Sequence, residues 1–206
     1  MWGDNTYGEL GDGTNIDEFW TTSDGTGHNG EVTAISSGAT DVAAGPYGSH
    51  VCAVKSGEVW CWGRNDNGEL GDGTLINRNV PVRAGTLTGA DQLAVGSDYT
   101  CAHTTSGSIW CWGKNGYGQL GNGTTTSSST PLQVLTGAGT PLTGAASVSA
   151  GLYGTVCAAM TSGTAKCWGH GSNGELGNGA AADRPYADTS VTGISNAVQT
   201  ATSYPN

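Results

Sequence analysis

Four copies of one short phrase run through this chain of 206 residues and limit the folds that it can adopt. Each copy begins with Trp-Gly and ends in Gly-Glu/Gln-Leu-Gly-Asp/Asn-Gly, and the copies span 2–13, 62–73, 112–123 and 168–179. Their first residues lie 60, 50 and 56 positions apart. A period near 50 residues is typical of arrays of all-β units that cover one another's faces. We therefore expect a single repeat domain over 1–206, with repeats that start near residues 1, 58, 108 and 164.

Four strand-like segments recur in the same order within the repeats. An apolar run comes first, a segment with one cysteine second, a segment with another cysteine and the tryptophan third, and a weaker segment fourth. In chain order they are expected at 41–45, 51–54, 59–62 and 80–83, then 92–96, 100–103, 109–112 and 132–135, then 147–151, 156–159, 165–168 and 189–192. Short strands with hairpin signals predict four-stranded antiparallel blades, and so an all-β propeller.

The segment count predicts about three complete blades with partial blades at both ends. The chain opens on the third-strand tryptophan of one blade, and residues 196–203 are a further first-strand candidate that no cysteine segment follows. Because a ring usually needs at least four blades, we expect an incomplete or multi-chain propeller. A four-bladed ring, closed by this last segment, is the alternative.

The six cysteines occur as three pairs: Cys52 with Cys61, Cys101 with Cys111, and Cys157 with Cys167. A three-residue loop that ends at Gly107 places Cys101 opposite Cys111, and the same count around Ser162 places Cys157 opposite Cys167. A two-residue loop does so for the first pair. Opposed residues have Cβ atoms about 4.5–5.5 Å apart, close to the roughly 3.5–4.5 Å of a disulfide. We predict three cross-strand disulfides, with free buried thiols and a metal site as the alternatives.

The predicted disulfides and the net charge restrict the expected location of the protein and its expected partners. Disulfides persist in oxidising surroundings, so we expect an extracellular, periplasmic or cell-surface location. The formal net charge of −10 argues against nucleic acid as a partner. No stretch approaches the ~18 apolar residues of a membrane span. Trp2 follows Met1 directly, without a signal peptide, so a truncated or processed start is expected.

Two apolar landmarks recur in the phrase, and we interpret both as structural. Strand alternation places each tryptophan on the face opposite its neighbouring cysteine. A lone leucine in a polar turn is expected to fold that turn back onto the blade. The landmarks are Trp2, Trp62, Trp112 and Trp168, and Leu10, Leu70, Leu120 and Leu176.

The phrase also resembles the repeat of a known family. Residues 62–74 read Trp-Gly-Arg-Asn-Asp-Asn-Gly-Glu-Leu-Gly-Asp-Gly-Thr, and residues 112–124 read Trp-Gly-Lys-Asn-Gly-Tyr-Gly-Gln-Leu-Gly-Asn-Gly-Thr. With the preceding Val-Ala-Ala-Gly segment, they are similar to the repeat of the regulator of chromosome condensation family (RCC1-like repeats), in a bacterial-type extracellular variant with paired cysteines. The resemblance covers nearly the whole chain. It implies a β-propeller, commonly of seven blades.

No catalytic constellation emerges from the sequence, so we expect no enzyme and assign no catalytic, cofactor-binding or metal residues. The chain lacks a nucleophile-elbow motif and a zinc-protease motif. His50 lies just before a cysteine segment, where a structural hydrogen bond is expected. Carboxylates recur in the turns at Asp12, Asp66, Glu69, Asp72 and Glu175. Calcium binding is an alternative to solvated turns there, although no loop has EF-hand spacing.

Binding is therefore the leading functional hypothesis. The segment 15–31 lengthens the first repeat and carries Phe19 and Trp20, a candidate binding loop because aromatic residues dominate interfaces. The alternative is that they cover a blade edge. The resemblance implies an interaction role, since members include a nucleotide-exchange factor that binds chromatin and a secreted inhibitor of β-lactamases. We expect an extracellular module that binds a protein or a cell-surface polymer. The alternatives are a self-assembling structural subunit and a secreted enzyme inhibitor.

Overall fold

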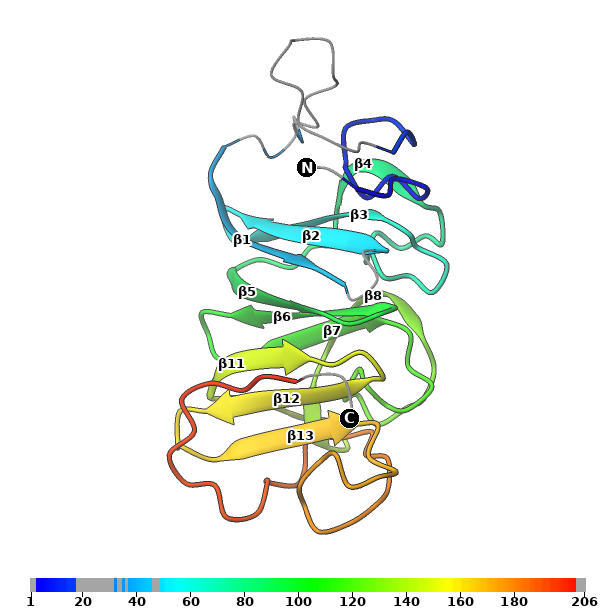
Figure 1. Cartoon of the computed structure of the whole chain (residues 1–206). Coiled ribbons are helices and arrows are strands. Elements are labelled where there is room, and N and C mark those ends of the chain that lie inside the picture. Colours follow the sequence, from blue (N-terminus) through cyan, green and yellow to red (C-terminus); the bar gives the residue numbers. More distant parts are fainter. Residues whose placement is uncertain (1–2, 18–31, 33–34, 36, 46–48, 203–206) are drawn as a thin grey trace.

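The computed structural model describes residues 3–17, 32, 35, 37–45 and 49–202. Among these residues are two four-stranded antiparallel sheets, one three-stranded antiparallel sheet and a two-stranded hairpin, and in each of them neighbouring strands follow chain order. Figure 1 shows these sheets stacked one above another from the N-terminal to the C-terminal part of the chain. The expectation of all-β blades is confirmed. No helix of the described residues is long and apolar enough to cross a membrane.

In each blade the first three strands cover the expected segments, apart from the glycine that ends the first segment. The first blade contains β1 (Ala39–Ala44), β2 (His50–Lys55), β3 (Glu58–Gly63) and β4 (Arg78–Arg83). The second contains β5 (Ala90–Val95), β6 (Tyr99–Thr104), β7 (Ile109–Gly113) and β8 (Ser128–Gln133). The third contains β11 (Ala145–Ala150), β12 (Thr155–Met160) and β13 (Ala165–Gly169), and the small hairpin of β9 (Leu135–Gly137) and β10 (Thr140–Pro141) precedes it.

The third blade differs from the prediction at its outer edge, because no strand forms at 189–192. Two isolated bridges, Lys166 with Ser190 and Gly169 with Arg184, join this segment to β13. In the first blade, the outer strand advances from Arg78 to Arg83 while β3 retreats from Gly63 to Trp60. The outer segment of the third blade has one residue more over the same interval, and this extra residue interrupts the ladder.

The expected strand at 196–203 is also absent from its described part, residues 196–202. The segment nevertheless lies where a first strand belongs. Ala197 N donates to Gly163 O, as Ala90 N donates to Gly57 O in the first blade. A ladder is lacking because no second strand pairs with this segment.

The predicted hairpin registers are confirmed in all three blades. Cys52 faces Cys61, Cys101 faces Cys111, and Cys157 faces Cys167. Each pair is a disulfide with 4.1 Å between its Cα atoms. The two-residue turn of the first blade has positive φ angles at both Ser56 and Gly57, as such tight hairpins require.

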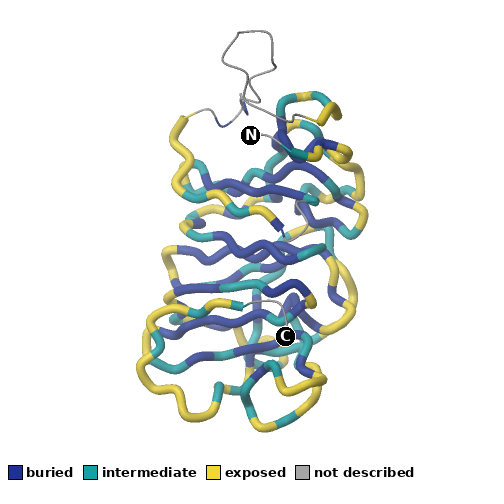
Figure 2. Tube along the Cα trace, viewed as in Figure 1, coloured by how far each residue is buried: buried dark blue, intermediate teal, exposed yellow. Residues whose placement is uncertain are grey.

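The leucine of each turn is buried. Leu70 belongs to a buried cluster with Cys52 and Cys61 of its own blade and Trp112 of the next blade. Leu120 and Trp168 take the same places one repeat later, and Leu176 packs on the third disulfide. Leu10 and Trp62 are likewise buried, whereas Trp2 lies outside the described residues. The cores thus sit between successive blades (Figure 2).

Candidate functional site

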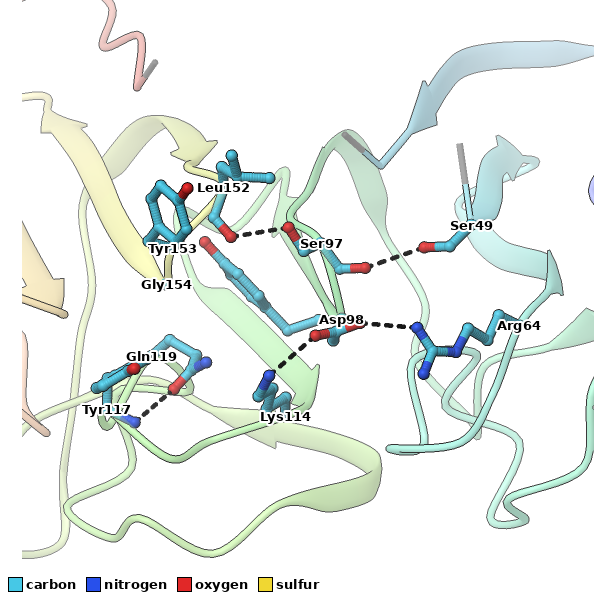
Figure 3. A pocket seen from close by; sticks show the side chains of 11 residues that line it. Ser49, Arg64, Ser97, Asp98, Lys114, Tyr117, Gln119, Leu152, Tyr153 and Gly154 are labelled. Carbon is cyan, nitrogen blue, oxygen red and sulfur yellow. Dashed lines mark hydrogen bonds and ion pairs between the residues drawn. The ribbon is translucent and has the colours of Figure 1, made fainter. Parts of the chain in front are cut away.

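The loops at one end of the blades surround a cavity of about 310 Å³. The β1–β2, β5–β6 and β11–β12 connections contribute to it, as do the residues that follow β3 and β7 (Figure 3). We call this end of the molecule the loop face. The cavity is lined by Ser49, Arg64, Ser97, Asp98, Tyr99, Lys114, Tyr117, Gln119, Leu152, Tyr153 and Gly154.

Serine hydroxyls fasten the three loops to one another. Ser49 Oγ donates to Ser97 O at 3.0 Å, and Ser97 Oγ donates to Leu152 O at 2.8 Å. Beneath them the buried Tyr99 hydroxyl donates to Gly151 O at 2.9 Å. Each bond joins one blade to the next, so the loop face is a preformed surface held by the sheets below.

One carboxylate organises the charges at the cavity. Asp98 Oδ2 lies 3.0 Å from Lys114 Nζ, and its Oδ1 lies 3.5 Å from Arg64. Arg64 also pairs with Asp66 at 2.7 Å and lies over the ring of Tyr7, 5.6 Å from its centroid. Two of the chain's seven basic residues therefore gather here, fixed by shared acceptors.

Tyrosines flank these charges. Tyr117 and Tyr153 are 42% and 46% exposed, although both lie in turns next to buried residues. The Tyr117 ring meets His170 edge to face with 4.6 Å between ring centroids. Tyrosine and arginine are enriched at protein interfaces, so the half-exposed tyrosines near Arg64 favour contact with a protein.

His50 lies below the loop face as a structural residue. Thr100 Oγ1 donates to Glu69 O, so His50 Nε2, 2.9 Å from the same oxygen, must be the donor to it. Burial lowers the pKa of His50 to about 4. The imidazole is therefore neutral at physiological pH.

Two serine hydroxyls at the cavity are used as hydrogen-bond donors between the loops. The hydroxyls of Ser49 and Ser97 point to carbonyl oxygens and not to a histidine or a carboxylate. Within the described ranges, no group of three or more His, Cys, Asp or Glu residues is placed to hold a metal ion. Asp72, a member of the calcium alternative, hydrogen-bonds Thr74 and Arg78.

Sequence reasoning did not find these cavity residues. The candidate loop residues Phe19 and Trp20 lie outside the described residues. The disulfides, tryptophans and leucines that it did single out lie between and within the blades. One signal was available: the residue after each Trp-Gly changes from Asp4 to Arg64, Lys114 and His170, while the Trp-Gly before it repeats. Positions that vary within a constant repeat are where binding differs.

The fold and this loop face define a blade-repeat protein of the β-propeller type. The family model of the regulator of chromosome condensation (RCC1) repeat matches residues 56–103 and 106–158, and a second model of that repeat matches 90–119. The chain belongs to this RCC1 repeat family.

Known proteins share parts of the sequence. The chain is 35% identical over 107 residues to the human E3 ubiquitin-protein ligase HERC2. The matched residues make up 50% of this chain and 2% of the ligase. It is also 36% identical over 77 residues to the ultraviolet-B receptor UVR8 of Arabidopsis thaliana. Here the matched residues make up 36% of this chain and 17% of the receptor. The chain therefore spans only a small part of these relatives.

Solved structures share the fold. Human WBSCR16 matches 89% of this chain and 46% of its own with a TM-score of 0.64 and 23% identity. Prp20p from Saccharomyces cerevisiae, described with its binding properties to Gsp1p and histones, matches 75% of this chain and 38% of its own with a TM-score of 0.61 and 20% identity. The chain spans less than half of either structure.

Proposed function

We propose that this protein is a non-catalytic, extracellular interaction module, and that it binds a protein or a cell-surface polymer through the loop face. The observation that carries the proposal is the cavity, where Tyr117, Tyr153, Arg64 and Lys114 converge on loops fastened by hydrogen bonds. A preorganised surface loses little conformational entropy on binding. The binding of Gsp1p and histones by Prp20p supports an interaction role for such a propeller.

The three disulfides support an oxidising location. All six cysteines are at least nine-tenths buried and every one is paired. Each disulfide closes a loop of nine or ten residues, and such a loop contributes about 2–3 kcal/mol in the chain-entropy model. In a reducing compartment this contribution would be lost.

Site-specific photo-crosslinking tests the role of the loop face. A benzophenone amino acid replaces Tyr153 in one protein and Ser106, in the turn at the other end of β6, in a control protein. Both proteins are prepared with their three disulfides formed. They are then incubated with intact cells and extracellular fluid from the organism that carries the gene. We expect position 153 alone to give a discrete adduct, which an excess of unlabelled wild-type protein removes.

A competitor variant makes the same experiment decisive. The double substitution Lys114→Glu/Tyr117→Ser changes two exposed side chains of the cavity and should compete at least about tenfold less well, because it removes a tyrosine, a residue type that often carries much of the binding energy, and reverses a charge. Equal adducts from both positions, no adduct at 153, or equal competition by the variant would refute the proposal.

A further inference from the structure

A second cavity, of about 540 Å³, lies at the end of the second blade away from the loop face. Residues 85–88, which connect β4 to β5, form one side of it, and the β6–β7 turn with parts of β7 and β8 forms the other. Its volume falls within the roughly 300–1,000 Å³ of small-molecule sites. We call it the hydroxyl groove, after the side chains of Thr86, Thr88, Thr104, Ser106, Ser108 and Thr130 that line it.

One aromatic side chain, that of Trp110, also lines the groove. Trp110 lies in β7 between Ala102 of β6 and Gln133 of β8, and it packs against a buried cluster that includes Leu87. It is only half-buried. Leu87 and Pro131 add apolar surface to the groove. The strands and the core therefore hold the indole in place while part of it stays open to a ligand.

The hydroxyls form one fixed wall and one free wall. On the fixed wall, Thr104 Oγ1 donates to Ser108 O at 3.1 Å, so Ser106 Oγ, 2.9 Å from Thr104 Oγ1, must be the donor to it. On the free wall, Thr86 and Thr88 are exposed, and no side-chain hydrogen bond joins either of them to another described residue. Their hydroxyls can both donate to a ligand and accept from it.

Charge is absent from the groove, since none of its ten lining residues carries one. The equivalent places in the neighbouring blades are charged. In the first blade, Glu58 stands in the place of Ser108 and pairs with Arg83 at 3.0 Å. In the third blade, Lys166 stands in the place of Trp110. Among the three described blades, the second alone combines an indole with uncharged hydroxyl side chains.

We propose that the hydroxyl groove binds an uncharged saccharide. One face of a sugar ring carries mainly C–H groups, and these stack on the electron-rich face of the Trp110 indole. The hydroxyls of the sugar exchange hydrogen bonds with Thr86 and Thr88. An acidic saccharide is disfavoured, because the groove has no cation to pair with it and the chain has a net charge of −10. An apolar peptide would leave these hydroxyls without partners, which costs free energy.

The hydroxyl groove is separate from the loop face. The β6–β7 turn and the β5–β6 connection lie at opposite ends of β6, so each site can bind without the other. A benzophenone at position 106 would fill the groove, and the control protein for the loop face therefore holds no saccharide there. Failure of one proposal leaves the other standing.

Titration with soluble oligosaccharides tests the groove. Hexamers of β-linked glucose, xylose, mannose and N-acetylglucosamine are each added to isotope-labelled protein, and the indole N–H resonances are followed by NMR. We expect at least one hexamer to bind with a Kd below about 1 mM. It should shift the resonance of Trp110, which the variant Trp110→Phe assigns, and leave those of the buried Trp62, Trp112 and Trp168 in place.

The comparison ligands are an acidic hexamer of galacturonic acid and an uncharged peptide of leucine and serine. No shift of the Trp110 resonance with any neutral hexamer at about 5 mM would overturn the proposal, because such binding would be too weak for a built site. An equal shift with the acidic hexamer or with the peptide would overturn it as well.

Two variants remove the binding groups. Trp110→Lys introduces the residue that the third blade has in this register, and it should weaken binding at least about tenfold because the stacking surface is lost. Thr86→Ala/Thr88→Ala should weaken it about fivefold or more. Thr125→Ala, which changes an exposed threonine outside the groove, should bind as the parent does. Undiminished binding in both groove variants, or an equal loss in the control, would contradict the proposal.

Discussion

At the scale of single residues, two buried titratable side chains, those of His50 and Glu69, belong to residues that meet where the first blade packs on the second. His50 shares the hydroxyl of Thr100 with the carbonyl of Glu69. Burial lowers the pKa of His50 to about 4, while burial raises the pKa of the Glu69 carboxyl above its ordinary 4.5. As pH falls, protonation of His50 lowers the free energy of unfolding, whereas protonation of Glu69 raises it.

His50 should make the fold sensitive to acid. Its folded pKa is depressed, so its contribution is present above pH 6.5 and is lost as pH falls from 6.5 toward 4. The loss should reach up to about 3 kcal/mol at pH 4. Urea denaturation of Glu69→Gln, with and without His50→Gln, measures it. His50→Gln should flatten the slope between pH 6.5 and 4, and equal slopes would contradict this account.

Glu69 should cost stability at neutral pH. Its folded pKa is raised, so its cost disappears as pH falls through that pKa and is fully present at higher pH. Gln119, one repeat later, does the same structural work without a charge, since its Oε1 accepts from Tyr117 N at 2.9 Å. Glu69→Gln should therefore raise the unfolding free energy at pH 7.5 by about 1 kcal/mol. The matched Gln119→Glu should lower it; stabilities unchanged in both variants would refute the argument.

At the scale of elements, the seams between blades depend on glycine at one position of each turn. Gly68 and Gly174 have nearly the same φ, but only Gly68 faces the backbone of another blade. Their comparison separates backbone strain from a lost seam.

Gly68→Ala should destabilise far more than Gly174→Ala. Strain at positive φ costs roughly 1 kcal/mol in both variants. At Gly68 the new Cβ also collides with Ser129, whose Cα would be 2.5 Å away, so a total of about 3 kcal/mol is expected. Thermal and urea unfolding of the two variants supply the comparison. Similar losses of unfolding free energy in the two variants would show that Gly68 is not needed for the close contact with Ser129.

The three disulfides should differ in how quickly they are reduced in the native protein. Cys157 and Cys167 are 7% and 5% exposed, whereas the other four cysteines are fully buried. A short exposure to dithiothreitol, followed by alkylation and peptide mass spectrometry, should therefore label Cys157 and Cys167 first. Simultaneous labelling of all six would indicate global unfolding as the route of reduction.

Elements were predictable where local chemistry decides them. The registers of the hairpins follow from turns of two or three residues with glycine at positive φ, so counting outward from Ser-Gly sufficed. The predictions of an outer strand at 189–192 and of a strand at 196–203 were wrong because turn chemistry does not decide whether a segment forms a ladder with its neighbour. One extra residue between Arg184 and Ser190 interrupts the first ladder, and the second has no neighbour to pair with.

At the scale of the whole molecule, the proposed location depends on the oxidation state of all six cysteines. Protein isolated from its natural source in the presence of an alkylating agent, then denatured without reductant, should expose no free thiol. Reduction should then release six, because all the cysteines are paired. Six alkylated thiols before reduction would place the native protein in a reducing compartment.

The sequence by itself determined the blade, because a blade is built from contacts within some 50 residues: alternating strands, opposed cysteines and glycines that turn. It also determined that successive repeats pack on one another, since the turn leucine of one repeat contacts the tryptophan of the next repeat. Only the tertiary structure decided the loop face. Arg64, Asp98, Lys114 and Tyr153 belong to three different blades and meet only when blades stack. Glu175 repeats the sequence of Glu69, and what distinguishes them is whether another blade lies against them.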